Sequence, residues 1–442
     1  MKCAVVTPIG PGHELFAQDA AESVKTAYAA SPGPFDNIAV VEVDDTRGEL
    51  GRSAARNQGV RLAKQAGADW IFFLDADDIL DPHAFARVTP YIDRHDAVWG
   101  AIYELAADEE SGVIRPDQAL EMSSLGQLLA NHPWATLQIG HFVKTQVALA
   151  TPFNPRLDSG EDFDYYLRMW SQFNCIKIPV PLFYNRRDTH AGGPRATTGR
   201  EWRIVVERMI CEKCVATDFH ADFEYRGEKF RFYVFNPFDV IQRQHLKGQF
   251  FEIDELAHLD TWVAAGANIV EVGAYVGNHA VYYARFLQPR SMTVLEPNPE
   301  AISLLRRNLT ANAVHNADLT RLGIAAADTE ARYDMVCNDR ANRGATRLIP
   351  ASAGMVKSAP LDALIEQPVD FIKIDVEGME FEVLAGASRI IAASQPKIML
   401  EIFREHLPAF RQWIDRNAYR VARAFEHVDA VNFFIEPVSR AD

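Results

Sequence analysis

Two short apolar runs, far apart in the sequence, each end in a distinctive polar signature. Residues 70–74 (Trp-Ile-Phe-Phe-Leu) lead directly into residues 75–78 (Asp-Ala-Asp-Asp). In the second half, an apolar lead that includes Ile269 and Val270 enters residues 271–278 (Glu-Val-Gly-Ala-Tyr-Val-Gly-Asn). A short apolar run bounded by turn residues is typical of a strand buried on both faces, as in parallel sheets that helices cover. Each half of the chain is therefore expected to form an α/β fold.

The length of the chain predicts two domains. Its 442 residues exceed what one ordinary core accommodates, because domains usually have about 100–200 residues. Apolar runs alternate with helical patterns on both sides of residues 215–222, and no internal repeat or low-complexity segment interrupts them. We therefore predict one α/β domain over residues 1–217 and a second over residues 218–442.

Charge and hydropathy exclude several classes of partner. The formal net charge is -15 and no long basic run occurs, so nucleic acid is not expected as a partner. No apolar stretch approaches the ~20 residues of a membrane helix, and the N-terminus resembles a first strand rather than a signal peptide. The five cysteines do not form the pattern of a disulfide framework. We expect a cytoplasmic protein without an integral membrane segment, which could still associate peripherally with a membrane.

The acidic residues after the first apolar run suit a divalent metal ion. Asp75 and Asp77 follow the predicted strand directly, where carboxylates two residues apart can converge as a strand turns into a loop. Magnesium and manganese prefer such oxygen ligands and add the phosphate oxygens of a substrate. The alternative is a solvated turn before a helix that begins near Pro82, because acidic loops are common.

Further residues extend this pattern through the first half. Asp44 and Asp45 end the second predicted strand, residues 55–59 (Ala-Arg-Asn-Gln-Gly) follow, and residues 161–162 (Glu-Asp) enter a later helix. Over about residues 1–190, this combination resembles the family 2 glycosyltransferases of the GT-A fold. The chain departs from the family pattern at residues 45–50 (Asp-Thr-Arg-Gly-Glu-Leu), which lack the usual small Gly/Ser turn.

This resemblance implies roles for individual residues. Asp44 would contact the nucleoside of a nucleotide sugar, and Asp75 and Asp77 would serve its diphosphate and a manganese or magnesium ion. Asp162 would be the base that deprotonates the acceptor hydroxyl, in a single displacement that inverts the anomeric carbon. The further substrate-binding candidates are Thr7, Arg56 and Glu161.

Simpler readings compete with two of these roles. An exposed salt bridge is the alternative for Arg56. For Glu161 and Asp162, the alternative is a helix start at which the helix dipole favours negative charge.

Gly273 and Gly277 flank a predicted turn between a strand and a helix. Glycine permits backbone angles and a close ligand approach that a Cβ would block. A dinucleotide-binding fingerprint requires Gly-x-Gly-x-x-Gly, and Tyr275 and Asn278 occupy the positions of its later glycines, so NAD or FAD is disfavoured. The pattern Glu-x-Gly-x-x-x-Gly suits instead the first loop of an S-adenosylmethionine-dependent methyltransferase. Glu296 ends the next predicted strand, where a carboxylate can accept both ribose hydroxyls.

The second half carries four further motifs. They are residues 277–279 (Gly-Asn-His), 296–299 (Glu-Pro-Asn-Pro), 372–378 (Ile-Lys-Ile-Asp-Val-Glu-Gly), and Glu380 followed by 383–387 (Val-Leu-Ala-Gly-Ala). From about Phe223 to Glu401, these motifs resemble the FkbM family of methyltransferases. The resemblance implies the sheet of a class I methyltransferase and O-methylation of a hydroxyl, often on a sugar or a polyketide.

Residue roles follow from this second resemblance. Asp375 ends the fourth strand and would be the base or the carboxylate that positions the acceptor, with Glu377 and Lys373 in support; a helix cap is the alternative for Glu377. Residues 338–346 would form an acceptor-side loop whose Arg340 and Arg343 bind an anionic substrate or face water. The residues expected to bind the cofactor are Glu271, Gly273, Gly277, Asn278 and Glu296, with Asp328 at the adenine.

Together, the two resemblances predict a bifunctional enzyme. The fold class is α/β, with an N-terminal GT-A-like nucleotide-sugar fold and a C-terminal class I methyltransferase fold of the Rossmann-like type. The enzyme would transfer a sugar and methylate a hydroxyl, plausibly on the same bacterial surface glycan or glycolipid, and fusion would raise the local concentration of the shared intermediate. Two alternatives stay open: an N-terminal domain that only binds glycan, and a non-enzymatic scaffold.

Overall fold

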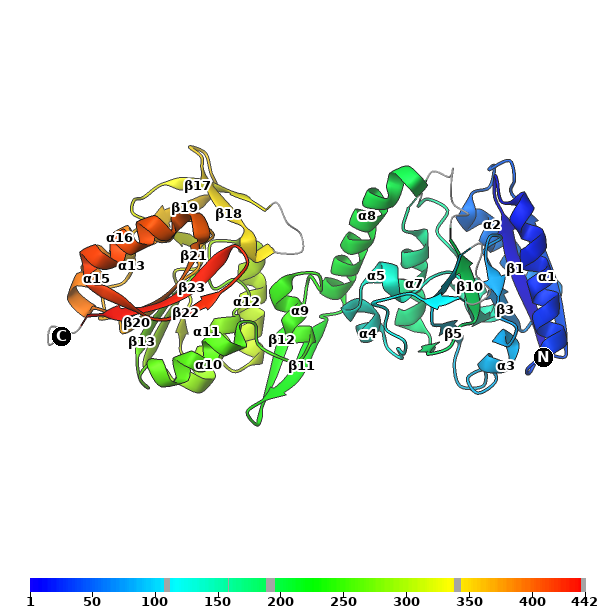
Figure 1. Ribbon diagram of the computed structural model, residues 1–442, viewed down its shortest axis with the longest axis horizontal. Coiled ribbons are helices and arrows are strands. Elements are labelled where there is room, and N and C mark those ends of the chain that lie inside the picture. Colours follow the sequence, from blue (N-terminus) through cyan, green and yellow to red (C-terminus); the bar gives the residue numbers. More distant parts are fainter. Residues whose placement is uncertain (107–111, 158, 188–194, 338–342, 439–442) are drawn as a thin grey trace. The chain divides into compact units, whose positions relative to one another are not determined.

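The computed structural model describes residues 1–106, 112–157, 159–187, 195–337 and 343–438 (Figure 1). The chain divides into two compact units, Met1–Thr217 and Asp218–Asp442. Each unit has its own apolar core. One cluster of buried side chains in unit 1 includes Phe72 and Phe142, and the two largest clusters in unit 2 are drawn wholly from its own residues.

Unit 1 is built on a six-stranded sheet of order β2-β1-β3-β8-β5-β9. The first three of these strands are parallel, and β8 is antiparallel to both of its neighbours. The carboxyl ends of β1, β2 and β3 therefore meet at one edge. The strands are β1 (Lys2–Ile9), β2 (Asn37–Asp44), β3 (Trp70–Phe73), β5 (Ala97–Gly100), β8 (His141–Lys144) and β9 (Cys175–Ile178).

Unit 1 also has a second, four-stranded sheet of order β4-β10-β6-β7. Its strands are β4 (Ile79–Leu80), β6 (Tyr103–Leu105), β7 (Val113–Ile114) and β10 (Phe183–Arg186). The helices of unit 1 are α1 (Glu14–Ala30), α2 (Arg52–Gln65), α3 (Ala84–Val88), α4 (Leu125–Ala130), α5 (Pro133–Thr136), α6 (Thr145–Ala150), α7 (Glu161–Gln172) and α8 (Arg195–Ala216).

Unit 2 is built on a seven-stranded sheet of order β15-β14-β13-β20-β21-β23-β22. All strands from β15 to β21 in this order are parallel, and β23 is antiparallel to both of its neighbours. The chain leaves β13 toward β14 and β15 and later returns to add β20 on the other side, so a topological switch point lies between β13 and β20. The strands are β13 (Asn268–Val272), β14 (Ser291–Leu295), β15 (Ala317–Asp318), β20 (Phe371–Ile374), β21 (Lys397–Phe403), β22 (Tyr419–Glu426) and β23 (Ala430–Pro437).

Helices cover both faces of this sheet. Neighbouring residues of β13 point to opposite faces, with Ile269 in one buried cluster and Val270 in the other, as the twofold periodicity of a strand requires. The helices are α9 (Val240–Leu246), α10 (Ile253–Trp262), α11 (Asn278–Tyr282), α12 (Pro299–Ala311), α13 (Leu361–Leu364), α14 (Glu380–Gly386), α15 (Ser388–Ser394) and α16 (Leu407–Asn417), with short turns at Tyr283–Leu287, Arg343–Ala345 and Arg404–His406.

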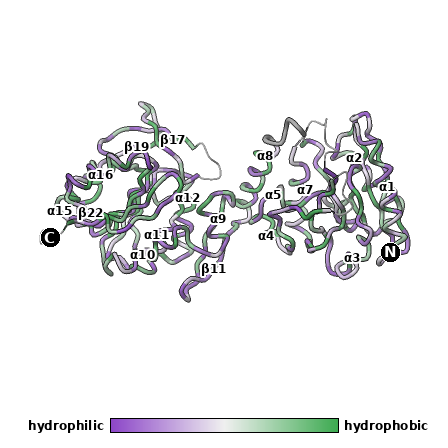
Figure 2. Tube along the Cα trace, viewed as in Figure 1, coloured by the Kyte–Doolittle hydropathy of each residue, from purple (hydrophilic) through white to green (hydrophobic). Residues whose placement is uncertain are grey.

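Two smaller sheets complete unit 2. A hairpin of β11 (His220–Tyr225) and β12 (Glu228–Tyr233) opens the unit. A four-stranded sheet has the order β16-β19-β17-β18, with strands β16 (Ile324–Ala326), β17 (Arg332–Val336), β18 (Arg347–Pro350) and β19 (Val356–Ala359). Hydrophilic and hydrophobic residues are interspersed along both units (Figure 2). Across the described segments, no helix has both the length and the apolar character needed to cross a membrane.

Candidate active sites

The predicted residues of the first half gather where β1, β2 and β3 end. Ile9 and Asp44 are partners in the register of β1 and β2. The amide of Leu74, just after β3, donates to the carbonyl oxygen of Val6 at 3.0 Å. Thr7, near the end of β1, is buried. The acidic segment 75–78 and the acidic end of β2 therefore share one sheet edge, as the parallel order of the strands requires.

Arg56 connects the acidic segment to the start of α7. Its Nη2 donates to Asp75 Oδ1 at 2.8 Å, and its Nη1 lies 3.8 Å from Glu161 Oε1. Arg56 is only 2% exposed, so the interpretation as an exposed salt bridge is wrong. Burial alone would lower the pKa of Arg56, but the two carboxylates outweigh it and raise that pKa. A buried guanidinium with these partners fixes the position of Asp75.

The next two carboxylates are buried in the same segment. Asp78 is 1% exposed and accepts hydrogen bonds from Asn185 Nδ2 at 3.0 Å and from the Arg186 amide at 3.3 Å. Burial, with Asp77 and Asp75 nearby, raises the pKa of Asp78 well above its usual range. Arg186 Nε also donates to the carbonyl oxygen of Asp77 at 2.6 Å. Asp78 thus joins the acidic segment to β10, a role that the sequence pattern did not reveal.

The two aspartates at the end of β2 differ in their surroundings. Asp44 is exposed, and it accepts hydrogen bonds from the amide and the hydroxyl of Thr46, which lower its pKa. Asp45 is buried and accepts from the amides of Leu50 and Gly51, both at 2.8 Å. The loop that lacks the small Gly/Ser turn is therefore closed by the Asp45 carboxylate. Asp44 remains the one of the pair that faces solvent.

Glu161 and Asp162 begin α7, as expected. Glu161 is buried and faces Arg56 and Arg52, whose Nη1 lies 3.4 Å from Glu161 Oε1. Asp162 is half-buried, and its Oδ1 accepts from the amide of Phe163 at 2.9 Å. A helix start and a functional carboxylate are compatible at this position, and the predicted role of Asp162 as a base stays a prediction.

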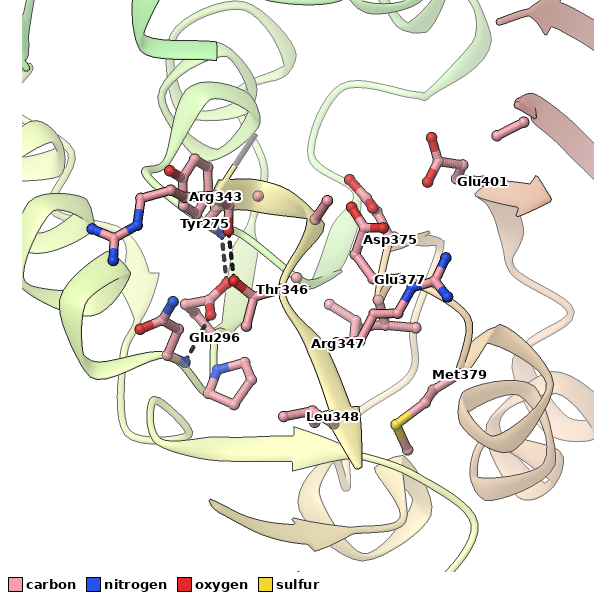
Figure 3. A pocket seen from close by; sticks show the side chains of 18 of the residues that line it. Tyr275, Glu296, Arg343, Thr346, Arg347, Leu348, Asp375, Glu377, Met379 and Glu401 are labelled. Carbon is pink, nitrogen blue, oxygen red and sulfur yellow. Dashed lines mark hydrogen bonds between the residues drawn. The ribbon is translucent and has the colours of Figure 1, made fainter. Parts of the chain in front are cut away.

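A cavity of about 910 Å³ opens in unit 2 at the carboxyl ends of β13 and β20 (Figure 3). The ends of four parallel strands contribute to its lining, which is the edge at which doubly wound sheets bind their ligands. Five of the residues predicted from sequence line it: Gly273, Glu296, Arg343, Asp375 and Glu377.

The two glycines of the turn are required by neighbouring parts of the chain. Gly273 has φ +82°, and a Cβ on it would lie 1.8 Å from the carbonyl oxygen of Asp375. Gly277 has φ +85°, and its Cβ would lie 2.7 Å from Leu305 Cδ1. The two glycines thus admit close approaches within the chain, between the end of β13 and Asp375 and between the turn and α12, and Gly273 also lines the cavity.

Glu296 ends β14 and lines the cavity beside the glycine turn. Its two carboxylate oxygens accept hydrogen bonds from the amides of Tyr275 at 2.7 Å and Asn298 at 2.8 Å. Burial raises the pKa of Glu296 to about 7, although the two amides act in the opposite direction. Each oxygen keeps acceptor capacity for a ligand hydroxyl, because an ionised carboxylate has about four acceptor sites.

Four cofactor-binding candidates, namely Gly277 and three residues with polar side chains, are not among the described residues that line the cavity. Asn278 is buried, and its side chain exchanges hydrogen bonds with the backbone of Phe251 at 2.9 and 3.1 Å. Glu271 is fully buried, and neither of its carboxylate oxygens has a hydrogen-bond partner in the described part of the chain. Asp328 is exposed and accepts from the Thr329 hydroxyl. The geometry gives no support to direct cofactor contacts by these three side chains.

Asp375 follows β20 and faces the cavity with a buried lysine behind it. Lys373 Nζ donates to Asp375 Oδ2 at 2.8 Å and to the carbonyl oxygen of Gly273 at 2.9 Å. The Lys373 side chain is 3% exposed and that of Asp375 is 35% exposed. Lys373 therefore fixes the Asp375 carboxylate against the glycine turn while one of its oxygens stays accessible.

Asp375, Glu377 and Glu401 form one acidic cluster at the cavity (Figure 3). One carboxylate oxygen from each lies within 4.8 Å of the others. Burial, reinforced by the neighbouring carboxylates, raises the pKa of Glu377 to about 8 and that of Glu401 to about 9. Sequence reasoning missed Glu401, although its place near the end of the next parallel strand is the same signal that identified Asp375.

The basic residues of the acceptor-side segment are only partly described. Arg340 lies outside the described residues. Arg343 lines the cavity, and its Nη1 forms an exposed ion pair with Glu300 at 2.9 Å. Arg347 also lines the cavity, where its guanidinium stacks 5.2 Å from the centroid of the Phe403 ring. The lining of the cavity thus includes these two arginines as well as the acidic cluster, so it carries both positive and negative charge.

Comparisons with family models agree with these two sites. Residues 26–135 match the model for glycosyl transferase family 2, and residues 271–421 match the model for the methyltransferase FkbM domain. The chain joins a family 2 glycosyl transferase domain to an FkbM methyltransferase domain. Both expected resemblances are thereby confirmed, and the two domains support glycosyltransferase and methyltransferase activity.

Solved structures give weaker likenesses. S. aureus TarS 1-349 is 16% identical, with a TM-score of 0.35, over 49% of this chain and 66% of that chain. A ribosomal protein L11 methylase from Lactobacillus delbrueckii subsp. bulgaricus is 13% identical, with a TM-score of 0.28, over 42% of this chain and 77% of that chain. An rRNA methylase from Streptococcus thermophilus is 10% identical, with a TM-score of 0.29, over 42% of this chain and 95% of that chain. At such values the likenesses carry no argument about function.

No curated protein matches this chain. The predicted fold class is confirmed: the chain is α/β, with a GT-A-like glycosyl transferase domain and a Rossmann-like FkbM domain.

Proposed function

We propose that this chain is a bifunctional enzyme. Residues 1–217 would transfer a sugar from a nucleotide sugar, and residues 218–442 would methylate a hydroxyl with S-adenosylmethionine as the donor. The observation that supports the second activity most strongly is the cavity at the β13/β20 switch point, most of whose lining lies within residues 271–421, the part that matches the FkbM domain.

The lining of the cavity fits S-adenosylmethionine. Its volume of about 910 Å³ lies within the range of about 300–1,000 Å³ that is usual for small-molecule sites. The apolar residues Leu295, Ile324 and Ala326 line it together with Glu296, a combination that suits an adenine beside a ribose. When bound, the cofactor supplies an electrophilic methyl group on its sulfonium sulfur.

Asp375 is our candidate for the group that receives the acceptor hydroxyl. Lys373 occupies Oδ2 of Asp375, which leaves Oδ1 as the oxygen that can accept a hydrogen bond from the hydroxyl and take its proton. The same lysine binds the carbonyl oxygen of Gly273, so the carboxylate and the glycine turn keep a fixed spacing. Such orientation can contribute up to about 7–11 kcal/mol of barrier reduction in favourable systems.

In unit 1, Asp44 is the candidate for nucleoside binding and Asp75 with Asp77 for the diphosphate and a manganese or magnesium ion. The donor set is all carboxylate, which fits a hard cation that would offset the charge of the departing diphosphate. Asp162 is the candidate base for an inverting transfer. The buried contact of Arg56 with Asp75 supports this arrangement, because it fixes one carboxylate where the parallel strands end.

We further propose that both activities act on one bacterial surface glycan or glycolipid. Joining the domains in one chain raises the effective concentration of the shared intermediate. A cytoplasmic location with peripheral membrane association belongs to the same proposal.

Mass spectrometry of surface glycans tests this function. Cells would carry the wild-type gene, no gene, Asp375→Asn, or Asp75→Asn combined with Asp77→Asn. We expect the glycan of cells with Asp375→Asn to lack a methyl group, and the glycan of cells with the double variant to lack a sugar. Unchanged glycans in cells without the gene would contradict the proposal.

One observation favours a second candidate function for unit 1. Arg56 already occupies one oxygen of Asp75, which leaves less negative charge for a metal ion. In this alternative, unit 1 only binds glycan for the methyltransferase domain. A manganese-dependent hydrolysis assay with a panel of nucleotide sugars separates the two, with Asp75→Ala and Asp77→Ala as controls. Turnover that both variants abolish supports the transferase, and absence of turnover with every donor supports the binding domain.

A further inference from the structure

A buried carboxylate outside the predicted site joins three segments around the cavity. Asp239 is 0% exposed and precedes α9. Its Oδ1 accepts hydrogen bonds from the amides of Ile241 at 3.2 Å and Gln242 at 3.1 Å, which is the usual arrangement of a helix N-cap. Its other oxygen, Oδ2, is not needed for the cap.

Oδ2 of Asp239 receives hydrogen bonds from two different segments that line the cavity. The Tyr275 hydroxyl donates to it at 2.9 Å, and the backbone amide of Arg343 donates to it at 3.0 Å. Tyr275 belongs to the glycine turn, and Arg343 is the first described residue of the predicted acceptor-side loop, which leads into β18. All of Tyr275, Arg343 and the first residues of α9 line the cavity.

Tyr275 also connects Asp239 to the carboxylate that is predicted to bind the ribose. Tyr275 has φ +45°, a backbone angle that non-glycine residues rarely adopt, and its amide donates to Glu296 Oε2 at 2.7 Å. Tyr275 therefore contacts the predicted ribose carboxylate through its amide and Asp239 through its hydroxyl. Figure 3 shows Tyr275, Glu296 and Arg343 grouped on one side of the cavity.

On the acceptor side, Arg343 is close in sequence to a second arginine that faces the acidic cluster. Arg343 is followed closely by Arg347, which lines the cavity and opposes the raised pKa of Glu377 by its positive charge. The Arg343 amide and a side chain that acts on the acidic cluster are thus joined by a short stretch of backbone.

We propose that Asp239 is a positioning residue through which occupancy of the cofactor site orders the acceptor-side segment 343–350. The proposal rests on the proposed binding of S-adenosylmethionine to this cavity. Because coupling between two sites is reciprocal, an acceptor would in turn strengthen cofactor binding.

Hydrogen–deuterium exchange on the full chain tests the coupling without knowledge of the acceptor. S-adenosylhomocysteine is the probe, and its binding is measured separately by calorimetry. In the wild type we expect saturating probe to slow exchange in peptides from residues 343–350 by about fivefold or more, the lower end of typical allosteric coupling.

Two variants each remove one arm of the link. Tyr275→Phe removes the hydroxyl and leaves the cap and the Arg343 contact. Asp239→Asn keeps a good N-cap but replaces the acceptor for the Arg343 amide by a donor. In both variants we expect the probe to bind within about threefold of its wild-type affinity while protection of 343–350 is lost. Glu300→Gln, which removes only the exposed ion pair of Arg343, is the matched control and should retain the protection.

The outcomes separate the inference from the proposed function. Failure of the wild-type chain to bind S-adenosylhomocysteine would overturn both. Binding without any change at 343–350, or protection that persists in both variants, would overturn the role of Asp239 and leave the proposed function standing. If either variant melts well below the wild type, Asp239→Ser, which also caps helices but lacks Oδ2, repeats the test.

Discussion

At the scale of single residues, the chemistry of unit 2 depends on how Asp375 is held. A buried lysine behind it contacts both the carboxylate and the glycine turn, so charge and geometry are set by one side chain. Removing one partner of a buried ion pair costs more than the pair contributes, because the other charge is left without compensation. The carboxylate and its lysine should therefore be tested by isosteric substitutions.

Asp375→Asn should lower kcat for methyl transfer by about 10²–10⁴-fold, the usual contribution of a positioned base. The affinity for S-adenosylhomocysteine should stay nearly unchanged, because the substitution keeps the size of the side chain. The measurement is transfer of labelled methyl to glycan from cells that lack the gene. Asp370→Asn is the control, since Asp370 precedes β20 at the opposite end of the strand. Equal activities of the two variants would exclude a role for Asp375.

Glu401 makes stability depend on pH in an unusual direction. Burial and the neighbouring carboxylates raise its pKa from 4.5 to about 9. Between these values the folded protein retains a proton that the unfolded chain releases, so stability falls as pH rises. Glu401→Gln should raise the Tm of unit 2 at pH 8.5, by an amount equivalent to about 1 kcal/mol, and change it much less at pH 5. Glu382→Gln, at an exposed helix position, should change the Tm equally little at both pH values. Identical dependence of Tm on pH for Glu401→Gln and the wild type would contradict the raised pKa of Glu401.

At the scale of elements, the end of β13 is fixed by its contact with β20. A Cβ at Gly273 would meet the carbonyl oxygen of Asp375 at 1.8 Å. Gly273→Ala should therefore destabilise unit 2 by about 3 kcal/mol or more. Gly266 has a similar φ of +76° but has open space around its missing Cβ, so Gly266→Ala isolates the conformational cost of about 1–2 kcal/mol. Thermal unfolding compares them, and equal losses would show that the contact is unimportant.

The link between α2 and α7 in unit 1 can be tested in the same way. Arg56→Ala leaves Asp75 and Glu161 without their shared buried partner and should destabilise unit 1 by about 3–5 kcal/mol. Arg208→Ala removes an arginine from an exposed pair with Glu212 on α8 and should cost at most about 0.5 kcal/mol. Chemical denaturation followed by tryptophan fluorescence gives both values. A loss for Arg56→Ala as small as that of the control would mean that the buried network does not stabilise the unit.

The elements also show what the sequence could and could not reveal. The strand ends and the glycine turn were predictable from sequence, because short apolar runs and the turn residues that bound them determine these features. The orientation of motif side chains was not: Asn278 binds the backbone of Phe251, a contact between segments 27 residues apart. Asp239 likewise acts across 36 residues to Tyr275 and 104 residues to Arg343, and no local pattern marks such a partner.

At the scale of the whole molecule, each unit has a core of its own. The two largest buried clusters of unit 2 contain only residues from position 223 onward. Residues 218–442 produced alone should therefore fold and bind S-adenosylhomocysteine within about threefold of the affinity of the full chain. Calorimetry on both proteins gives the comparison, with circular dichroism to confirm folding. A folded fragment that fails to bind would show that the site needs residues from the first half.

We expect the cavity at the carboxyl ends of β13 and β20 to bind the methyl donor. Titration of the full chain with S-adenosylhomocysteine, for the wild type and Glu296→Gln, tests it most directly. We predict one site per chain in the wild type and a loss of affinity of about tenfold or more in the variant, which keeps one acceptor oxygen but loses its charge. Absence of heat in the wild type, or equal affinity in both proteins, would contradict the claim.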